Sequence, residues 1–243
     1  MTMAASRQIL AMGGGGFSME PENLALDRYL LGLVERPRPR VCFLPTASGD
    51  ADSYIARFYT AFSALPCQPA HLSLFDTGNR PGHRDVLLSQ EIIYVGGGNT
   101  RSMLAVWREW QVDQILREAW QQGIVLAGIS AGSLCWFEEG VTDSVPGHLT
   151  PMRGLGLLPG SNCPHFDGEA ERRPTYHRLV ADGSIGAGYA ADDGAALHFH
   201  GDRLHQVVSS RPTATAYRVE RRGNAATETP LPTRYLGDSH HRP

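Results

Sequence analysis

Short apolar runs alternate along the first half of the chain with segments of helical periodicity. The apolar runs end at glycine- or proline-containing turns, a pattern typical of buried strands. They predict strands at 8–12, 40–44, 71–75, 91–95 and 123–127. The segments between them repeat apolar residues every three to four positions or link two strands. They predict helices at 23–35, 52–65, 102–107 and 111–122, a short linking segment at 85–90, and a helix continuing through 134–137.

This alternating order predicts the architecture. Near-continuous apolar strands joined by helices favour a mostly parallel central sheet with helices on both faces, a three-layer α/β fold. The second half is less regular, and its short strand-like runs predict hairpins near the edge of the sheet. These runs are 185–190, 195–199, 204–208 and 214–220.

The domain organisation predicted from the chain is simple. No linker or charge block divides it, so we expect a single α/β domain over 1–235 and a flexible tail over 236–243. The polar character begins earlier, at Arg221. The stretch from there to Pro243 contains Pro230 and Pro232, and we expect it to be loosely held.

Composition excludes several classes of function. Among 243 residues, 42% are hydrophobic, which is enough for a sizeable core. The net charge of −3 and the lack of basic runs argue against a nucleic-acid-binding role. No apolar stretch approaches the roughly 20 residues that span a bilayer, and the N-terminus lacks a signal-peptide pattern. With no CxxC pair among four cysteines, of which Cys42 and Cys135 fall in apolar patterns, we expect a reducing cytoplasm.

One segment has the spacing of a nucleophile elbow. Gly128-Ile-Ser-Ala-Gly132 matches Gly-x-Ser-x-Gly and lies between a predicted strand and a predicted helix. Small residues flank Ser130 because the backbone turns sharply there, and the turn aims free helix N–H groups at the reacting centre. The competing interpretation is that Ser130 is only a helix N-cap in a tight turn.

A nucleophilic serine needs a base and a group that orients the base. His165, in the loop-like segment 162–167, is the best candidate base, although a structural histidine is the alternative. The other histidines have less support as the base. His198, His200 and His205 occur in strand-like alternation, and His240 and His241 lie in the tail. His71 and His83 precede the serine, and His148 and His177 have no supporting context.

The orienting carboxylate has three candidates. Asp193 is preferred, Asp192 is its neighbour, and Asp143 lies thirteen residues after the serine. A pair of aspartates before Gly194 is also typical of a hairpin turn, so this structural interpretation stays open.

A glycine loop supplies candidate oxyanion donors. Gly96-Gly-Gly-Asn99 ends a predicted strand, and its flexible backbone can direct N–H groups to a developing negative charge, together with the N–H of Ala131. A phosphate loop or a plain turn is the alternative. No Gly-Lys-Ser/Thr follows, and the run 13–16 lacks GxGxxG spacing, so a nucleotide site is disfavoured.

Together these motifs resemble those of the peptidase E family, the aspartyl dipeptidase group of serine peptidases related to cyanophycinase. The resemblance covers about residues 8 to 210 and depends on five motifs in the family's order. They are Gly96-Gly-Gly-Asn-Thr100, Gly128-Ile-Ser-Ala-Gly132, Leu155-Gly-Leu-Leu-Pro159, Pro164-His-Phe166 and the Asp-Gly-Ala-Ala-Leu stretch at 193–197.

The resemblance implies a class I glutamine amidotransferase-like fold and a set of roles. Ser130 is implied as nucleophile and His165 as base, with oxyanion donors near Gly97 and Gly98 and at Ala131. Founding members have a glutamate where this chain has Asp193, and either carboxylate can orient an imidazole.

The resemblance also implies cleavage after an N-terminal aspartate. That substrate needs a cation for its carboxylate and an anion or carbonyl for its free amine. Arg172, or else Arg173, resembles the carboxylate clamp, although a solvated charge run is the alternative. Glu169 and Asn99 complete the expected substrate-binding set.

The expected partner is a small peptide, bound by a monomer or homodimer that needs no metal or cofactor. No His/Cys/Asp cluster in the sequence has zinc-ligand spacing. The alternatives are a related serine exopeptidase, such as a carboxypeptidase or cyanophycinase-type enzyme, and a non-catalytic small-molecule-binding protein on the same fold. An α/β-hydrolase esterase is disfavoured because His165 precedes Asp193.

Overall fold

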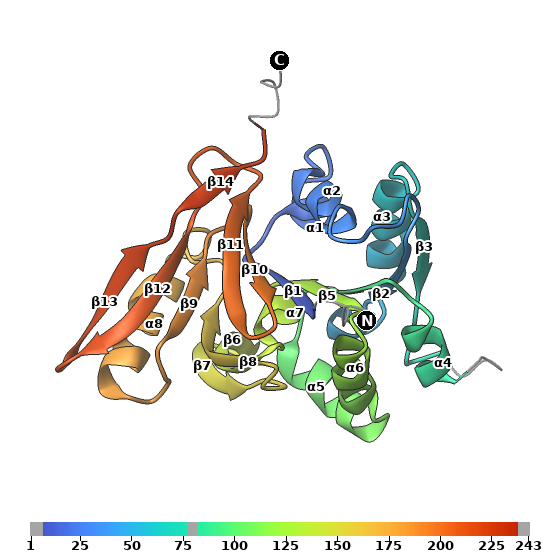
Figure 1. Cartoon of the computed structure of the whole chain (residues 1–243). Helices are drawn as coiled ribbons and strands as arrows, with labels where there is room; N and C mark the ends of the chain where they lie inside the picture. The colour runs from blue at the N-terminus through green and yellow to red at the C-terminus, as the bar shows by residue number, and fades with distance from the viewer. Residues whose placement is uncertain (1–6, 77–81, 238–243) are drawn as a thin grey trace, which may run out of the picture.

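The computed structural model describes residues 7–76 and 82–237 (Figure 1). Its main sheet has the strand order β14-β11-β10-β1-β5-β4-β2-β3. The five strands from β1 to β3 in that order are parallel, and the β10–β11 hairpin adds to β1 in antiparallel fashion. The strands are β1 (Gln8–Met12), β2 (Arg40–Leu44), β3 (Gln68–His71), β4 (Ile92–Val95), β5 (Val125–Ile129), β10 (Ala195–His200), β11 (Arg203–Ser209) and β14 (Thr233–Tyr235).

Two hydrophobic cores cover the two faces of this sheet. Leu10 and Met12 of β1 point into one core, whereas Ile9 and Ala11 point into the other, as the alternation of a strand requires. Figure 1 shows α1, α2 and α3 on one face and α5 and α6 on the other. The predicted α/β class, with a mostly parallel sheet and helices on both faces, is therefore confirmed.

The helices match most of the predicted segments with shifted ends. They are α1 (Gly16–Met19), α2 (Ala25–Leu31), α3 (Asp52–Phe62), α4 (His83–Leu88), α5 (Thr100–Glu109), α6 (Val112–Gln121), α7 (Ala131–Leu134) and α8 (Arg172–Asp182), with a 3-10 turn at Thr46–Ser48. The helix expected through 134–137 is wrong after its first residue, because α7 ends at Leu134, a turn follows, and Phe137 begins a strand.

A second sheet lies beside the first and was not predicted. Its order is β13-β12-β9-β8-β6-β7, and α8 packs against it through a small core of its own that includes Tyr176, Leu179 and Val219. The hairpin strands predicted near 185–190 and 214–220 belong to this sheet. Its strands are β6 (Phe137–Val145), β7 (His148–Arg153), β8 (Leu158–Cys163), β9 (Gly188–Ala191), β12 (Ala216–Arg222) and β13 (Ala225–Pro230).

Two further predictions are corrected by backbone pairing. The strand expected at 71–75 is instead β3 at Gln68–His71, and the Asp50 carboxylate then accepts the N–H of Leu74. The loosely held tail expected from Arg221 is wrong through 236, because β12, β13 and β14 pair in the sheets and the Leu236 N–H donates to Ser209 O at 2.8 Å. Residues 238–243 lie outside the described residues.

Cys42 and Cys135, which fall in apolar sequence patterns, lie in the core. Both thiols are buried and unpaired, and burial raises the pKa of Cys42 to about 12. Within the described part of the chain, no helix has both the length and the apolar character to cross a membrane.

A buried carboxyl group on α2 is expected to make the stability of the protein depend on pH. Asp27 is fully buried and accepts the Phe17 N–H at 2.9 Å, and burial raises its pKa to about 7. In the unfolded chain the pKa of Asp27 is near 3.8. The stability that the neutral carboxyl contributes is fully present below that pH and is lost as pH rises through the folded-state pKa of about 7. Between pH 5 and 8, wild type should lose about 2 kcal/mol of unfolding free energy relative to Asp27→Asn in urea titrations. Parallel pH curves for the two proteins would contradict this expectation.

Candidate active site

Ser130 occupies a strained turn at the end of β5. Its backbone has φ 57° and ψ −112°, and α7 begins at the next residue. The flanking glycines are required by close packing. A Cβ on Gly128 would collide with the carbonyl of Gly132, and a Cβ on Gly132 would collide with that of Val95. The Gly-x-Ser-x-Gly spacing therefore has a local structural cause, and the turn presents the serine at the carboxyl edge of the sheet.

The end of β1 joins three separate segments of the site. Consecutive carbonyls of Met12, Gly13 and Gly14 accept the N–H groups of Ser130, His165 and Gly194 at 3.2, 3.3 and 3.1 Å. Gly14 also forms a parallel bridge with Asp193. The glycine run at 13–16 is therefore not a nucleotide loop. Its backbone carbonyls bind the segments that contain the three predicted catalytic residues.

His165 and Asp193 form a close, largely buried pair. Nδ1 of His165 lies 2.6 Å from Oδ1 of Asp193, and each side chain is 11% exposed. Burial by itself would raise the pKa of Asp193. The hydrogen bond and charge of His165, with the charges of Arg211 and Arg172, outweigh burial and hold this pKa below its usual value. The carboxylate stays ionised, and Nε2 of His165 remains for proton transfer.

The two other candidate aspartates lie in different environments. Asp192 accepts the Thr215 N–H at 3.1 Å, and its pKa is raised to about 6, mainly by burial. Asp143 is exposed and lies 3.6 Å from Nη2 of Arg172. Among the three, the geometry favours Asp193 as the group that orients His165.

The glycine loop after β4 lies against Ser130, but its amides differ. A Cβ on Gly97 would come within 3.3 Å of the Ser130 Cβ, whereas the Gly97 N–H donates to the Tyr54 hydroxyl at 3.1 Å. Within the described part of the chain, the N–H groups of Gly98 and Ala131 donate to no protein acceptor. Ala131 is the first residue of α7, where helix N–H groups lack partners. The N–H groups of Gly98 and Ala131 are therefore available to an oxyanion, whereas that of Gly97 is engaged by Tyr54.

Several of the predicted substrate-binding residues already form hydrogen bonds within the protein. Arg172 is only 2% exposed; its Nε donates to Glu169 Oε2 at 2.6 Å and its Nη1 donates to Val141 O at 3.0 Å. Arg173 is paired with Glu228 instead. Asn99 caps α5, because its Oδ1 accepts the Ser102 N–H at 2.9 Å. Of the predicted set, Asn99 and Glu169 are exposed, and the Glu169 side chain is 45% exposed.

Gly14 gives a direct test of this arrangement. A Cβ there would overlap Asp193 Oδ1 and lie 3.1 Å from His165 Nδ1. Gly14→Ala should separate the pair and lower kcat by about a hundredfold, since displacements near 1 Å have such effects. Steady-state kinetics with a short peptide measure this, and circular dichroism checks the fold. A folded Gly14→Ala variant with wild-type kcat would contradict the assignment.

A strained serine at a strand-to-helix turn and a His–Asp pair held at the end of the neighbouring strand of an α/β sheet are typical of serine hydrolases. The model of peptidase family S51 matches residues 9–207, and the chain belongs to this family of serine-type peptidases. The resemblance to peptidase E is thereby confirmed.

Individual relatives agree with this placement. The chain is 58% identical over 234 residues to "Uncharacterized peptidase YgaJ" of Bacillus subtilis, covering 95% of this chain and 100% of that protein. It is 32% identical over 180 residues to "Probable alpha-aspartyl dipeptidase" of Drosophila melanogaster, covering 70% and 71%. A crystal structure of a peptidase from an acI-B1 Actinobacterium has the same fold, with a TM-score of 0.72, 18% identity and coverage of 95% and 96%.

Proposed function

We propose that the protein is a serine exopeptidase that removes aspartate from the N-terminus of short peptides through an acyl-enzyme. The observation that carries this proposal is the support of Ser130, His165 and the Asp193 segment on the three consecutive carbonyls of residues 12–14. That arrangement places a strained serine and a carboxylate-bound imidazole at one edge of the sheet.

The proposed reaction follows from these positions. Ser130 Oγ attacks the carbonyl carbon while Nε2 of His165 takes the hydroxyl proton, and the Gly98 and Ala131 N–H groups bind the oxyanion. The C–N bond then breaks as His165 returns the proton to the leaving amine. Water adds to the acyl-enzyme by the same route, which releases aspartate and restores Ser130.

The specificity proposal involves an exchange of partners at Arg172. Its guanidinium is held in place by Val141 O, whereas Glu169 is half-exposed and free to turn outward. The substrate's aspartyl carboxylate would take Glu169's place on Arg172, and Glu169 would then bind the free amine. The charge of Arg172 also helps to lower the pKa of Asp193. The name of the Drosophila relative supports the same specificity.

A cavity beside Glu169 favours one second candidate. It has a volume of about 570 Å³, within the range of small-ligand sites. Its lining includes the carboxylates of Asp143, Glu169 and Glu171 and the guanidinium of Arg178, so acidic groups outnumber basic ones. This acidic lining favours a related serine exopeptidase with another specificity, one that accepts a cationic residue.

A substrate panel tests both candidates. Asp-Leu should be cleaved with kcat/KM about a hundredfold or more above Asn-Leu and Ala-Leu, because a site built for a carboxylate rejects neutral analogues strongly. N-acetyl-Asp-Leu should not be cleaved. Glu169→Gln should weaken Asp-Leu cleavage, whereas Glu171→Gln, from the same cavity, is the matched control. Equal cleavage of Asn-Leu would reject aspartyl specificity, and a preference for peptides with Lys or Arg would favour the second candidate.

A further inference from the structure

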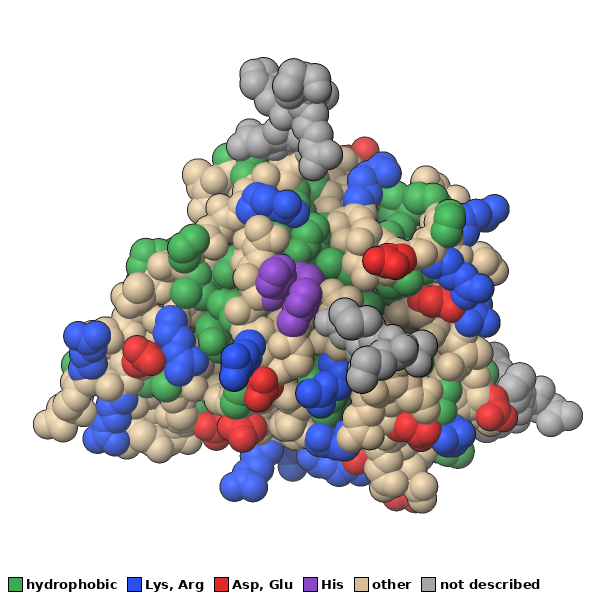
Figure 2. Space-filling view, viewed as in Figure 1, with side chains coloured by type: hydrophobic (Ala, Val, Ile, Leu, Met, Phe, Trp, Pro, Cys, Tyr) green, Lys and Arg blue, Asp and Glu red, His purple; other side chains and the backbone are tan. Residues whose placement is uncertain are grey.

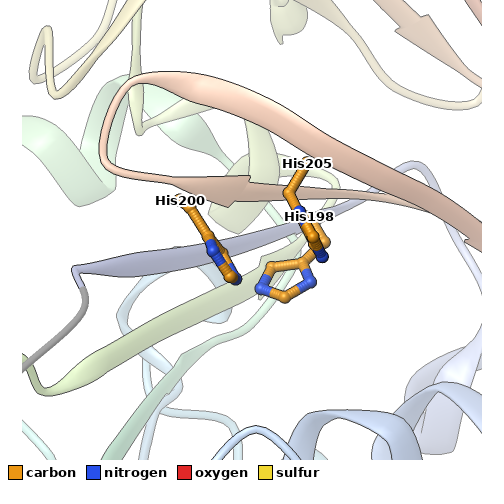
Figure 3. A group of neighbouring side chains, drawn as sticks. All are labelled: His198, His200 and His205. Carbon is orange, nitrogen blue, oxygen red and sulfur yellow. The ribbon is translucent and has the colours of Figure 1, made fainter.

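Three histidines converge at the end of the β10–β11 hairpin. His198 and His200 are two residues apart on β10 and share one face of the strand. A register shift after His198 brings His205 of β11 beside them. The His200 and His205 rings stack with centroids 4.2 Å apart, and His198 lies 4.7 Å from His200 and 5.4 Å from His205. Figure 3 shows the three rings turned toward one another.

The nitrogen atoms of these rings are close enough to share an ion. One nitrogen from each residue can be chosen so that all lie within 4.8 Å of one another. A tetrahedral zinc ion with Zn–N bonds near 2.1 Å needs nitrogens roughly 3.4 Å apart. His200 and His205 are exposed, so their rings have room to rotate, and binding requires the nitrogens to approach by up to about 1.4 Å. Figure 2 shows histidine side chains exposed on this face, which leaves an open path for an ion.

The chemistry of the rings suits a metal. Three imidazole rings converge here, one of them buried and two exposed. Imidazole nitrogen is a ligand that zinc, copper and nickel take readily.

The buried histidine is already oriented by outer partners. Its Nδ1 lies 2.8 Å from the Tyr29 hydroxyl of α2, and its Nε2 lies 3.0 Å from Gln8 Oε1 of β1. Because both nitrogens have partners, an ion that binds His198 must displace either Tyr29 or Gln8, and the remaining partner then holds the ring. Such second partners fix the ring orientation of metal-binding histidines.

We propose that His198, His200 and His205 form a site for a divalent transition metal such as Zn²⁺, with its fourth position open to water or an external ligand. An all-imidazole set favours Zn²⁺, Ni²⁺ or Cu²⁺ over Mg²⁺ and Ca²⁺. The site is separate from the proposed catalytic residues. β10 begins at Ala195, just after Asp193, and His198 and His200 lie three and five residues further along it, or roughly 10–17 Å. Sequence spacing alone predicts no such site, because the bulged hairpin brings His205 into place.

Calorimetric titration with Zn²⁺ alone tests the proposal. The background protein is the full chain with His240→Gln and His241→Gln, which removes the two adjacent histidines near the C-terminus as competing zinc ligands. This background should bind one Zn²⁺ equivalent. Adding His200→Ala and His205→Ala should weaken that binding by about tenfold or more, since loss of even an outer partner typically costs 10–100-fold.

A matched control separates this site from other histidines. His148→Ala, at an exposed histidine on β7, should leave zinc affinity unchanged. Peptidase activity measured without added metal should be equal in the background and the His200/His205 double variant. No zinc binding by the background, unchanged binding in the double variant, or an equal loss in His148→Ala would overturn the proposal.

Discussion

Replacing Ser130 with alanine is expected to lower kcat for a cleavable short peptide by about 10⁴–10⁶-fold, the range seen when a serine nucleophile is removed. Without Oγ no acyl-enzyme forms, and only the oxyanion donors and substrate binding remain. The fold should persist, because the Ser130 N–H to Met12 O bond at 3.2 Å involves the backbone alone. Discontinuous assay of the released amino acid by chromatography measures the change.

A neighbouring serine provides the control for that prediction. Ser133 lies in α7 and donates its hydroxyl proton to Asn162 Oδ1 at 3.2 Å, away from the proposed chemistry. Ser133→Ala should retain most of the activity. Activity that survives Ser130→Ala, or that is lost equally in both variants, would contradict the nucleophile assignment.

The second large effect is expected at Asp193. Asp193→Asn should reduce kcat by about 10⁴-fold, because an amide neither holds the correct His165 tautomer nor stabilises the imidazolium. The 2.6 Å contact with Nδ1 makes this the sole acidic group paired with His165 among the described residues. Pre-steady-state measurement of acyl-enzyme formation locates the loss in the chemical step.

Asp192→Asn is the matched control for Asp193→Asn. An asparagine there can still accept the Thr215 N–H that Asp192 accepts at 3.1 Å, so activity should change little. A larger loss in Asp192→Asn than in Asp193→Asn would exchange the two roles and contradict the geometry.

The parts of the fold that sequence predicts well are the buried parallel strands. β1, β2, β4 and β5 are nearly continuous apolar runs because both of their faces are covered, and such runs stand out along a sequence. The second sheet was not predicted in full because strands such as Leu158–Cys163 mix glycine, proline and polar residues. Backbone pairing holds these strands, and pairing leaves little mark in the sequence.

Some residues of the candidate site could likewise be predicted from the sequence, whereas others could not. The Gly-x-Ser-x-Gly spacing indicated Ser130 because its local turn requires those glycines, whereas the role of Gly13 and Gly14 depends on segments about 150 and 180 residues away and has no local pattern. Burial of Arg172 is likewise a tertiary effect. The cap at Asn99 was within reach of the sequence, since asparagine directly before a helix is a favoured N-cap.

The central claim is that Ser130 is the nucleophile activated by His165. Incubation with a fluorophosphonate, followed by peptide mass spectrometry, tests it without knowledge of the natural substrate. One adduct is expected, on Ser130. It should form in wild type, be absent in Ser130→Ala and form much more slowly in His165→Ala. An adduct on another residue, or an active wild-type enzyme that forms no adduct, would contradict it.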